Sequence, residues 1–316
     1  MGKYNSALLI FNEKSGQSDI NYQMDLIQSH FNLHRIPLKV ENLPASSEQL
    51  DALISEAIAN STDLFIAAGG DGTAALVGSP LVGTGKPMGI LPIGTGNFLA
   101  KELGIPLNLK SALNLITTND ADLFQLDTIE FLHRHYIRNI SMGVVSKVIN
   151  DTPSEEKKRF GFFAYVIHFF QQILGLELNR YNLEYDHQKK TVVASEILIT
   201  NARLMGIEPL EWPEDILIND GVMEIFVIRA ANLLDIMRFL FSAATKRRLK
   251  TPIIKSMKFN HYCRIETQTP AMVQADGDLI GKSPIEVHIK HQSLTIIVPD
   301  KDAIGIQREK RNKRKE

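Results

Sequence analysis

The sequence predicts an α/β domain with a parallel sheet, followed by a second domain built mainly from antiparallel β-strands. Strand-like and helix-like segments alternate through residues 1–125, a spacing typical of βαβ units. Near residue 122 the pattern changes to short β-rich runs separated by turn residues. We therefore expect a first domain at residues 1–125 and a second at residues 126–300. A basic tail at residues 301–316 would follow, with packing back on the first domain as one option.

The first domain is expected to contain four buried strands, each followed by a glycine loop or a helix. Apolar residues recur on one helical face after the first strand, and Ser46 or Ser47 can cap the helix after the second. Another helix is expected to run from the third strand through Leu76. The four expected strands are residues 7–11, 36–40, 64–68 and 88–91.

The second domain shows two helical patterns, at residues 160–176 and 233–243, among its β-rich runs. The first pattern is aromatic but contains His168, Gln171 and Gln172 and barely reaches the length needed to span a membrane. We expect a helix that packs in the core, lines an acyl-chain groove or touches a bilayer. The β-rich runs are residues 123–131, 135–140, 180–185, 191–200, 222–228, 257–259, 264–267, 285–289 and 294–298.

Composition narrows the class of protein. The chain has 316 residues, 44% hydrophobic and 22% charged, which is enough apolar content for real cores. Its net charge of -1 is not the excess of positive charge that is typical of nucleic-acid-binding proteins. Cys263 is the single cysteine in the sequence, which excludes a disulfide framework. The apolar run at residues 7–11 is too short for a signal peptide, so we expect a cytoplasmic protein. The basic run at residues 308–316 is either a solvated end or a weak attraction to anionic membranes.

Glycines gather where the third expected strand ends. Residues 69–73 read Gly-Gly-Asp-Gly-Thr, which disfavours both helix and strand. Bare backbone at the start of a helix can cradle phosphate oxygens, whereas a tight turn is the alternative. Two further loops, residues 12–16 and 91–97, follow neighbouring strands at the same edge of the expected sheet. A triphosphate is the natural occupant of such an edge.

Two familiar phosphate motifs do not fit. Pro80 and Pro87 occupy positions that a Walker A loop needs for its first glycine and its hydroxyl residue. Leu99 stands where a dinucleotide fingerprint needs its third glycine. Neither a Walker nucleotidase nor a Rossmann dehydrogenase is supported.

The motif GGDGT together with LPIGTGNFLAKELGIP resembles the diacylglycerol kinase catalytic-domain superfamily. That superfamily includes bacterial soluble lipid kinases and sphingosine and ceramide kinases, with NAD kinases as distant relatives. Asn219-Asp-Gly221 and Ala275-Asp-Gly-Asp278 resemble its two downstream acidic motifs, so the resemblance covers nearly the whole chain.

The resemblance implies that ATP binds on the glycine loops and that a lipid hydroxyl enters from the second domain. Two departures from the family pattern accompany it. Glu13 replaces the proline of the first loop, and residues 40–42 lack the nucleotide-contacting threonine of many bacterial members. The implied nucleotide-binding residues are Asn12, Gly69, Gly70, Asp71, Gly72, Thr73, Gly94, Thr95, Gly96 and Asn97.

The acidic motifs imply the base and the metal. By resemblance Asp276 is the general base for the lipid hydroxyl, with Asp278 in a supporting role; a simple β-turn is the alternative. Asp220 would bind Mg²⁺ with the carbonyls of Leu217 and Val222, and again a hairpin turn is the alternative.

The leading hypothesis is therefore an ATP- and Mg²⁺-dependent lipid kinase, acting in the cytoplasm or peripherally at the inner membrane surface. Its partner would be a lipid acceptor presented at a membrane: a diacylglycerol-like lipid, phosphatidylglycerol or a sphingoid base. The alternatives are a phosphotransferase of the NAD kinase type and a non-catalytic lipid- or nucleotide-binding protein. No TGSTAY-like second motif of NAD kinases is present, and the glycines and Asp276 are retained.

Overall fold

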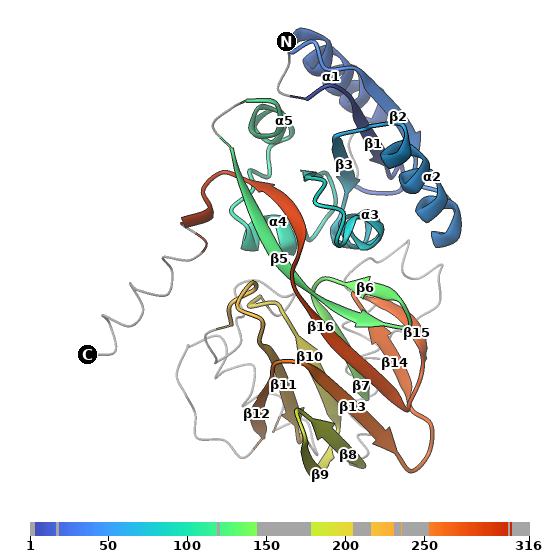
Figure 1. Cartoon of the computed structure of the whole chain (residues 1–316), viewed down its shortest axis with the longest axis vertical. Coiled ribbons are helices and arrows are strands. Elements are labelled where there is room, and N and C mark those ends of the chain that lie inside the picture. Colours follow the sequence, from blue (N-terminus) through green and yellow to red (C-terminus); the bar gives the residue numbers. More distant parts are fainter. Residues whose placement is uncertain are drawn as a thin grey trace, which may run out of the picture. The chain divides into compact units, whose positions relative to one another are not determined.

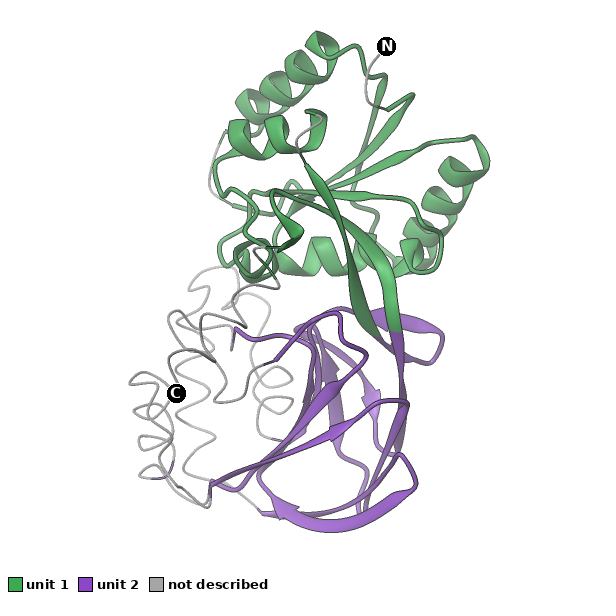
Figure 2. Cartoon of the chain, turned by 60° about the vertical axis from the view of Figure 1, so that its left-hand side comes forward, with its two compact units in different colours: residues 1–128, 291–316 green, residues 129–290 purple. Residues whose placement is uncertain are grey.

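The computed structural model describes residues 4–16, 19–118, 121–143, 178–204, 216–230, 235, 253–302 and 304. The helix expected at residues 160–176 and the basic run at 308–316 lie outside these residues, as does all but Asp235 of the pattern at 233–243. Figure 2 shows the two compact units of the chain, residues 1–128 with 291–316 and residues 129–290. In the described part of the chain no helix is long and apolar enough to cross a membrane.

The first unit is built on a parallel sheet. Strands β1 (Ala7–Phe11), β2 (Leu38–Asn42), β3 (Leu64–Gly69) and β4 (Met88–Pro92) lie in the order β2-β1-β3-β4. All three pairings are parallel, and Phe11 is the register partner of both Asn42 and Ala68. The carboxyl ends of these strands therefore lie side by side, which is where the three predicted loops begin (Figure 1).

Helices follow the strands, and those after β1, β2 and β3 are the ones that the sequence predicts. They are α1 (Ile20–Leu33), α2 (Ser47–Ala59), α3 (Asp71–Gly78), α4 (Phe98–Glu102) and α5 (Leu109–Thr117), with a short 3₁₀ helix η1 (Ser79–Leu81). Ser46 caps α2 as predicted, because its side chain accepts from the backbone N–H of Gln49. Asp19 and Asn108 cap α1 and α5 in the same way. Apolar side chains from α1, α5 and the strands form one buried core.

The second unit is a sandwich of antiparallel strands. One sheet has the order β12-β11-β10-β7-β14-β15, and the other continues from β16 through β13 and β8 to β9. Buried residues from both sheets, such as Met142, Ile225, Leu183 and Val287, form a single core cluster. Two strands, β5 (Asp122–Phe131) and β16 (Ile285–Val298), continue from one unit into the other. The remaining strands are β6 (Arg134–Tyr136), β7 (Asn139–Gly143), β8 (Asn179–Tyr185), β9 (Gln188–Ala194), β10 (Glu196–Thr200), β11 (Met223–Ile228), β12 (Ile254–Phe259), β13 (Tyr262–Thr267), β14 (Met272–Ala275) and β15 (Asp278–Lys282).

The predicted fold class is confirmed, and the element boundaries differ in informative ways. The runs at 285–289 and 294–298 form one strand, β16, whose last residues pair with β4 in the first unit through Ile296 and Met88. From the sequence, residues 294–298 were expected in the second domain, because no local signal distinguishes them from the other β-rich runs of that domain. The run at 135–140 is split by a turn into β6 and β7, and α4, α5, β14 and β15 were not anticipated.

His30 is a buried polar residue that ties α1 to α5. Its Nε2 lies 2.8 Å from the hydroxyl of Thr117, and that hydroxyl donates to the carbonyl of Leu113. Nε2 therefore carries the proton that Thr117 accepts. Burial lowers the pKa of His30, and the neighbouring charge of His34 lowers it further.

We expect acid to destabilise the protein partly through His30. Because the pKa of His30 is lower in the folded state, the unfolded state takes up its proton first. The His30 contribution is complete above about pH 6.5 and is lost as the pH falls below that value. His30→Gln keeps a donor for Thr117 without titrating, so its melting temperature should fall less than the parent's between about pH 7.5 and about pH 5.5.

The control is His133→Asn, at an exposed turn position with positive φ that asparagine tolerates. Comparison with this variant shows whether a reduced acid loss is specific to His30 or follows from the removal of any histidine. Equal acid losses in the parent and His30→Gln would contradict the assignment.

Candidate functional site

The three predicted loops of the first unit are joined to one another by hydrogen bonds. The Asn12 side chain donates to the Thr73 hydroxyl over 2.9 Å. The Asp71 carboxylate accepts the backbone N–H of Leu99, at 2.8 Å. The backbone N–H of Gly94 donates to the carbonyl of Gly69, at 3.2 Å. Segments that are far apart in sequence thus form one rigid edge at the carboxyl ends of β1, β3 and β4.

Several of the glycines are required by this loop-to-loop packing. A Cβ on Gly94 would lie closer than 3.0 Å to the backbone of Gly70, and a Cβ on Gly69 would collide equally with Thr73. Gly16 has a φ of +82°, and a Cβ on this residue would collide with the carbonyl oxygen of Ile93. These positions admit no side chain, whether or not a ligand is present.

Gly72 is different, because nothing lies within 4 Å of the position its Cβ would take. It is exposed in the first turn of α3, whose N-cap is Gly70 and has no side-chain cap. The first N–H groups of a helix need partners from outside the helix, and the N-terminus attracts anions. Bare backbone at Gly72 therefore suits the close approach of a phosphate.

Asn97 holds the second glycine loop from inside. It has a φ of +51°, and its amide nitrogen donates to the carbonyls of Pro92 and Gly94 at 3.0 and 2.7 Å. Its side chain is only 8% exposed, and its Oδ1 has no hydrogen-bond partner in the described part of the protein. Thr95, in contrast, is exposed at the tip of the loop. Asn97 and Thr73 thus support the site, while Gly72 and Thr95 face outward.

The two departures from the family pattern meet in the structure. The Asn42 side chain at the end of β2 donates to the Glu13 carboxylate over 2.8 Å. The acidic residue in the first loop is therefore held by the residue that ends the second strand. Sequence inspection noted both positions but gave no reason to connect them.

Asp276 lies in the second unit, in the two-residue turn between β14 and β15. Asp276 and Gly277 have φ values of +48° and +98°, as a type I′ turn requires. The carboxylate accepts three backbone N–H groups, from Ile137, Arg138 and Asn139, at 2.8, 2.9 and 3.0 Å. The turn foreseen as the alternative is present, and its aspartate also binds the segment between β6 and β7.

A second aspartate in this unit has the same architecture. Asp186 occupies the two-residue turn between β8 and β9, also at positive φ, and accepts N–H groups from Asn260, His261 and Tyr262. At Asp186 burial acts to raise the pKa, but the three N–H groups outweigh it and the pKa is lowered. At Asp276 burial is the stronger influence, and the pKa is raised despite its three N–H groups. A carboxyl group with a raised pKa is a candidate for proton transfer.

The predicted metal residues lie in the turn that precedes β11. The Asp220 side chain is exposed and accepts the backbone N–H of Val222 at 3.1 Å, while Leu217 is partly buried. Carboxylate and carbonyl oxygens are the donors that Mg²⁺ prefers, and Mg²⁺ needs only one or two carboxylates because it keeps several waters. The donor set therefore fits Mg²⁺, although no group of three His, Cys, Asp or Glu residues suited to a metal occurs among the described residues.

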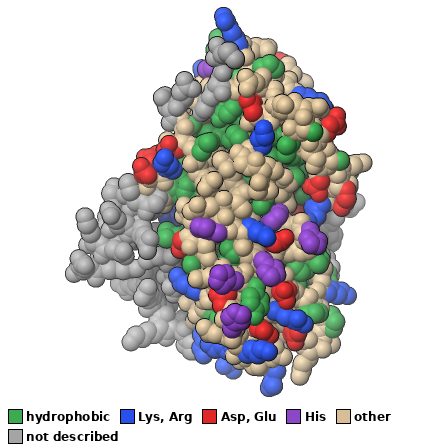
Figure 3. Space-filling model, viewed as in Figure 1, with side chains coloured by type: hydrophobic (Ala, Val, Ile, Leu, Met, Phe, Trp, Pro, Cys, Tyr) green, Lys and Arg blue, Asp and Glu red, His purple; other side chains and the backbone are tan. Residues whose placement is uncertain are grey.

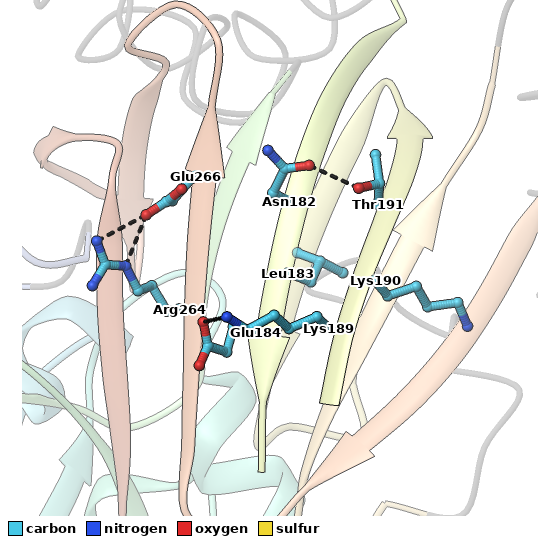
Figure 4. Close-up of a pocket in the computed structure, with 8 residues that line it drawn as sticks. All are labelled: Asn182, Leu183, Glu184, Lys189, Lys190, Thr191, Arg264 and Glu266. Atoms are coloured by element: carbon cyan, nitrogen blue, oxygen red, sulfur yellow. Dashed lines mark hydrogen bonds and ion pairs between the residues drawn. The ribbon is translucent and has the colours of Figure 1, made fainter. Parts of the chain in front are cut away.

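A concavity of about 440 Å³ lies elsewhere, on strands β8, β9 and β13 (Figure 4). None of the predicted site residues lines it, and most of its polar side chains are paired with one another. Lys189 pairs with Glu184 at 3.3 Å, Arg264 with Glu266 at 2.8 Å, and Thr191 donates to Asn182. Figure 3 shows the same mixture of basic, acidic and histidine side chains over the face in view. This balanced surface gives no reason to expect a charged ligand.

Family comparison agrees with both halves of the chain. Residues 6–127 match the diacylglycerol kinase catalytic domain, and residues 139–298 match the YegS C-terminal NAD kinase beta sandwich-like domain. The second match alone covers more than half of the chain. The chain belongs to the family of diacylglycerol kinase-like proteins that combine these two domains.

The relatives span most of the chain. An uncharacterized protein of Synechocystis sp. is 28% identical over 95% of this chain and 71% of its own length. The diacylglycerol kinase of Bacillus subtilis is 24% identical, with 94% and 97% covered. A crystal structure of a diacylglycerol kinase from Bacillus anthracis matches with a TM-score of 0.76 at 22% identity, over 94% of this chain and 98% of that one, which shows a shared fold.

Two glycine substitutions should affect stability differently. Gly94→Ala forces a Cβ against the Gly70 backbone, so we expect a loss of about 1–3 kcal/mol, typical of overpacking. Gly72→Ala meets no atom within 4 Å and sits in a helix, so it should be neutral or stabilising by at most about 1 kcal/mol. Urea unfolding of both variants measures this. A Gly94→Ala protein as stable as the parent would contradict the close loop packing.

Proposed function

We propose that the protein is an ATP- and Mg²⁺-dependent kinase that transfers the γ-phosphoryl group to a lipid hydroxyl. The observation that carries the proposal is the first turn of α3. It begins at Gly70 with no side-chain cap, is open at Gly72, and is fixed by hydrogen bonds to two other loops. The match to the diacylglycerol kinase catalytic domain over residues 6–127 supports the same reading.

Phosphate binding on α3 would use backbone rather than side chains. The N–H groups of the first turn and the positive end of the helix dipole would hold phosphate oxygens. Asp71 also lies in that first turn, with one carboxylate oxygen bonded to the N–H of Leu99. A carboxylate beside a polyphosphate is repulsive unless a cation lies near both, which supports a requirement for Mg²⁺. Bound Mg²⁺ would reduce the negative charge on the phosphates; Asp220, Leu217 and Val222 are proposed for a separate Mg²⁺ site.

Asp276 is proposed as the base for the lipid hydroxyl. A carboxylate has about four acceptor sites, and the described backbone N–H groups use three of them. The remaining site on Oδ2 can accept a hydrogen bond from a hydroxyl group. The raised pKa of Asp276 strengthens its carboxylate as a base for that proton. The proposal requires Asp276 and the loops of the first unit to act on the same phosphoryl group.

The acceptor is proposed to be a lipid presented at a membrane surface, which the protein would visit as a peripheral cytoplasmic enzyme. The names of the relatives favour diacylglycerol, and phosphatidylglycerol and sphingoid bases belong to the same chemical class of acceptor. The test is to incubate the purified protein with radiolabelled ATP and Mg²⁺, adding as acceptor either mixed micelles that contain each lipid in turn or NAD. Labelled lipid supports the proposal, whereas labelled NADP alone, or no labelled product with any acceptor, would overturn it.

Gly72→Ala gives a sharp test of phosphate binding. Because its Cβ would meet no protein atom, the variant should fold like the parent. If phosphates approach the bare backbone there, the added methyl group should weaken ATP binding at least about tenfold, equivalent to about 1.4 kcal/mol. Calorimetric titration with Mg²⁺ and ATP measures the affinity. Parent-like affinity in a stably folded Gly72→Ala protein would remove α3 from the binding site.

Asp276→Asn should lower kcat by about 10²–10⁴-fold, the usual contribution of a general base. The amide cannot accept hydrogen bonds with its nitrogen, so one of the three N–H groups loses its acceptor. That loss costs about 1–3 kcal/mol of stability. Asp186→Asn is the matched control, because it suffers the same loss at an equivalent turn. We expect similar destabilisation in both variants and a large fall in kcat in the Asp276 variant alone; equal kcat in the two variants would mean that Asp276 only caps a turn.

A further inference from the structure

We propose that Gln274 is a positioning residue for Asp276, acting by fixing the Asp276–Gly277 turn to strand β7. The inference rests on the proposed role of Asp276 as the base. Gln274 stands two residues before Asp276 on β14 and is only 3% exposed. Sequence inspection did not single it out.

The side chain of Gln274 makes three hydrogen bonds. Its carbonyl oxygen accepts the backbone N–H of Gly277 at 3.1 Å. Its amide nitrogen donates to the Asn139 side-chain oxygen at 3.0 Å and to the Ser141 hydroxyl at 2.8 Å. Burying an amide is costly unless its polar atoms are paired, and here both ends are paired. Gln274 therefore connects the second residue of the turn to β7.

The partners of Gln274 also hold Asp276 directly. The backbone N–H of Asn139 donates to the Asp276 carboxylate, and the carbonyl of Asn139 accepts the backbone N–H of Asp276, both at 3.0 Å. Gln274 thus acts on Asp276 from two sides, through Gly277 after it and through Asn139 opposite it. A displacement of about 1 Å at a reacting group can cost about a hundredfold in rate, so such bracing has a clear use.

The strand register supports the same reading. The register of β14 against β15 shifts between Val273 and Gln274. Val273 pairs with Gly281, whereas the next residue, Gln274, pairs with Leu279. Such bulges redirect side chains and occur beside active sites.

The turn at Asp186 provides an internal comparison. Its carboxylate makes the same three backbone contacts, but the residue two positions earlier is Glu184. Glu184 is partly exposed and pairs with Lys189 and with the Tyr262 hydroxyl. A carboxylate-capped turn therefore forms in this unit without a buried glutamine two residues before it. The glutamine at Asp276 adds rigidity beyond what the turn itself requires.

The test uses Gln274→Met, which keeps the length of the side chain but removes its hydrogen bonds. With the turn less firmly held, Asp276 should lose part of its N–H contacts, and its titration should move to higher pH. We expect kcat to fall about ten- to a hundredfold with little change in the KM for ATP, and the acid limb of the kcat profile to move to higher pH. Carbon-13 NMR of labelled aspartate carboxyl groups, assigned with Asp276→Asn, measures the Asp276 titration without any substrate.

Ser195→Ala is the control, because Ser195 is equally buried and bonds to Ile228 and Ala230, away from the turn. It should lose stability but keep the parent pH profile and the parent Asp276 titration. Ser141→Ala, which removes one partner of Gln274, should shift that titration in the same direction but less, and it serves if Gln274→Met does not fold.

A folded Gln274→Met protein, or failing that a folded Ser141→Ala protein, with the parent Asp276 titration would overturn the proposal. A parent protein that transfers no phosphate to lipid would instead overturn the proposed function. The NMR titration would then still decide whether Gln274 positions Asp276.

Discussion

The close approach of the Gly70 and Gly94 backbones is the constraint on which the first unit depends. It brings the loops after β3 and β4 into contact, which is possible only because Gly94 has no side chain: a Cβ on Gly94 would lie closer than 3.0 Å to the Gly70 backbone, whereas a Cβ on Gly70 would make only an ordinary contact. The Asn12–Thr73 and Asp71–Leu99 hydrogen bonds then add the remaining segments to this edge. As a result, contacts from several parts of the chain hold the first turn of α3, and its orientation does not depend on one flexible loop.

The second unit also holds a candidate functional residue in a fixed position, but it does so with backbone hydrogen bonds. It fixes Asp276 with backbone N–H groups, which cannot rotate away as side chains can. The contrast with Asp186 shows that this geometry alone does not decide the protonation behaviour. The same three contacts give a lowered pKa at Asp186 and a raised one at Asp276, because the surroundings of Asp276 exclude more water. Local geometry sets the direction of the carboxylate, and burial sets its basicity.

The fold class and the glycine loops could be predicted from sequence, because both depend on local signals. Alternating apolar runs specify the βαβ units, and glycines after a strand mark a tight backbone. The supports of the site could not be predicted. Gln274 acts through Asn139 and Ser141, more than a hundred residues away, and only the pairing of β14 with β7 brings them together. Likewise, Glu13 and Asn42 were noticed separately, and their hydrogen bond follows from the register of β1 and β2.

The route of β16 has a consequence for how the protein comes to be folded. Ile296 pairs with Met88, so the strand beside β4 comes from the far end of the chain. During synthesis residues 1–128 of the first unit are made early, yet one edge of their sheet stays open until residues 294–298 have left the ribosome. An open, apolar strand edge invites pairing with other chains. The nascent protein thus spends most of its synthesis with this edge unprotected, and chains interrupted before β16 are the ones most exposed to aggregation.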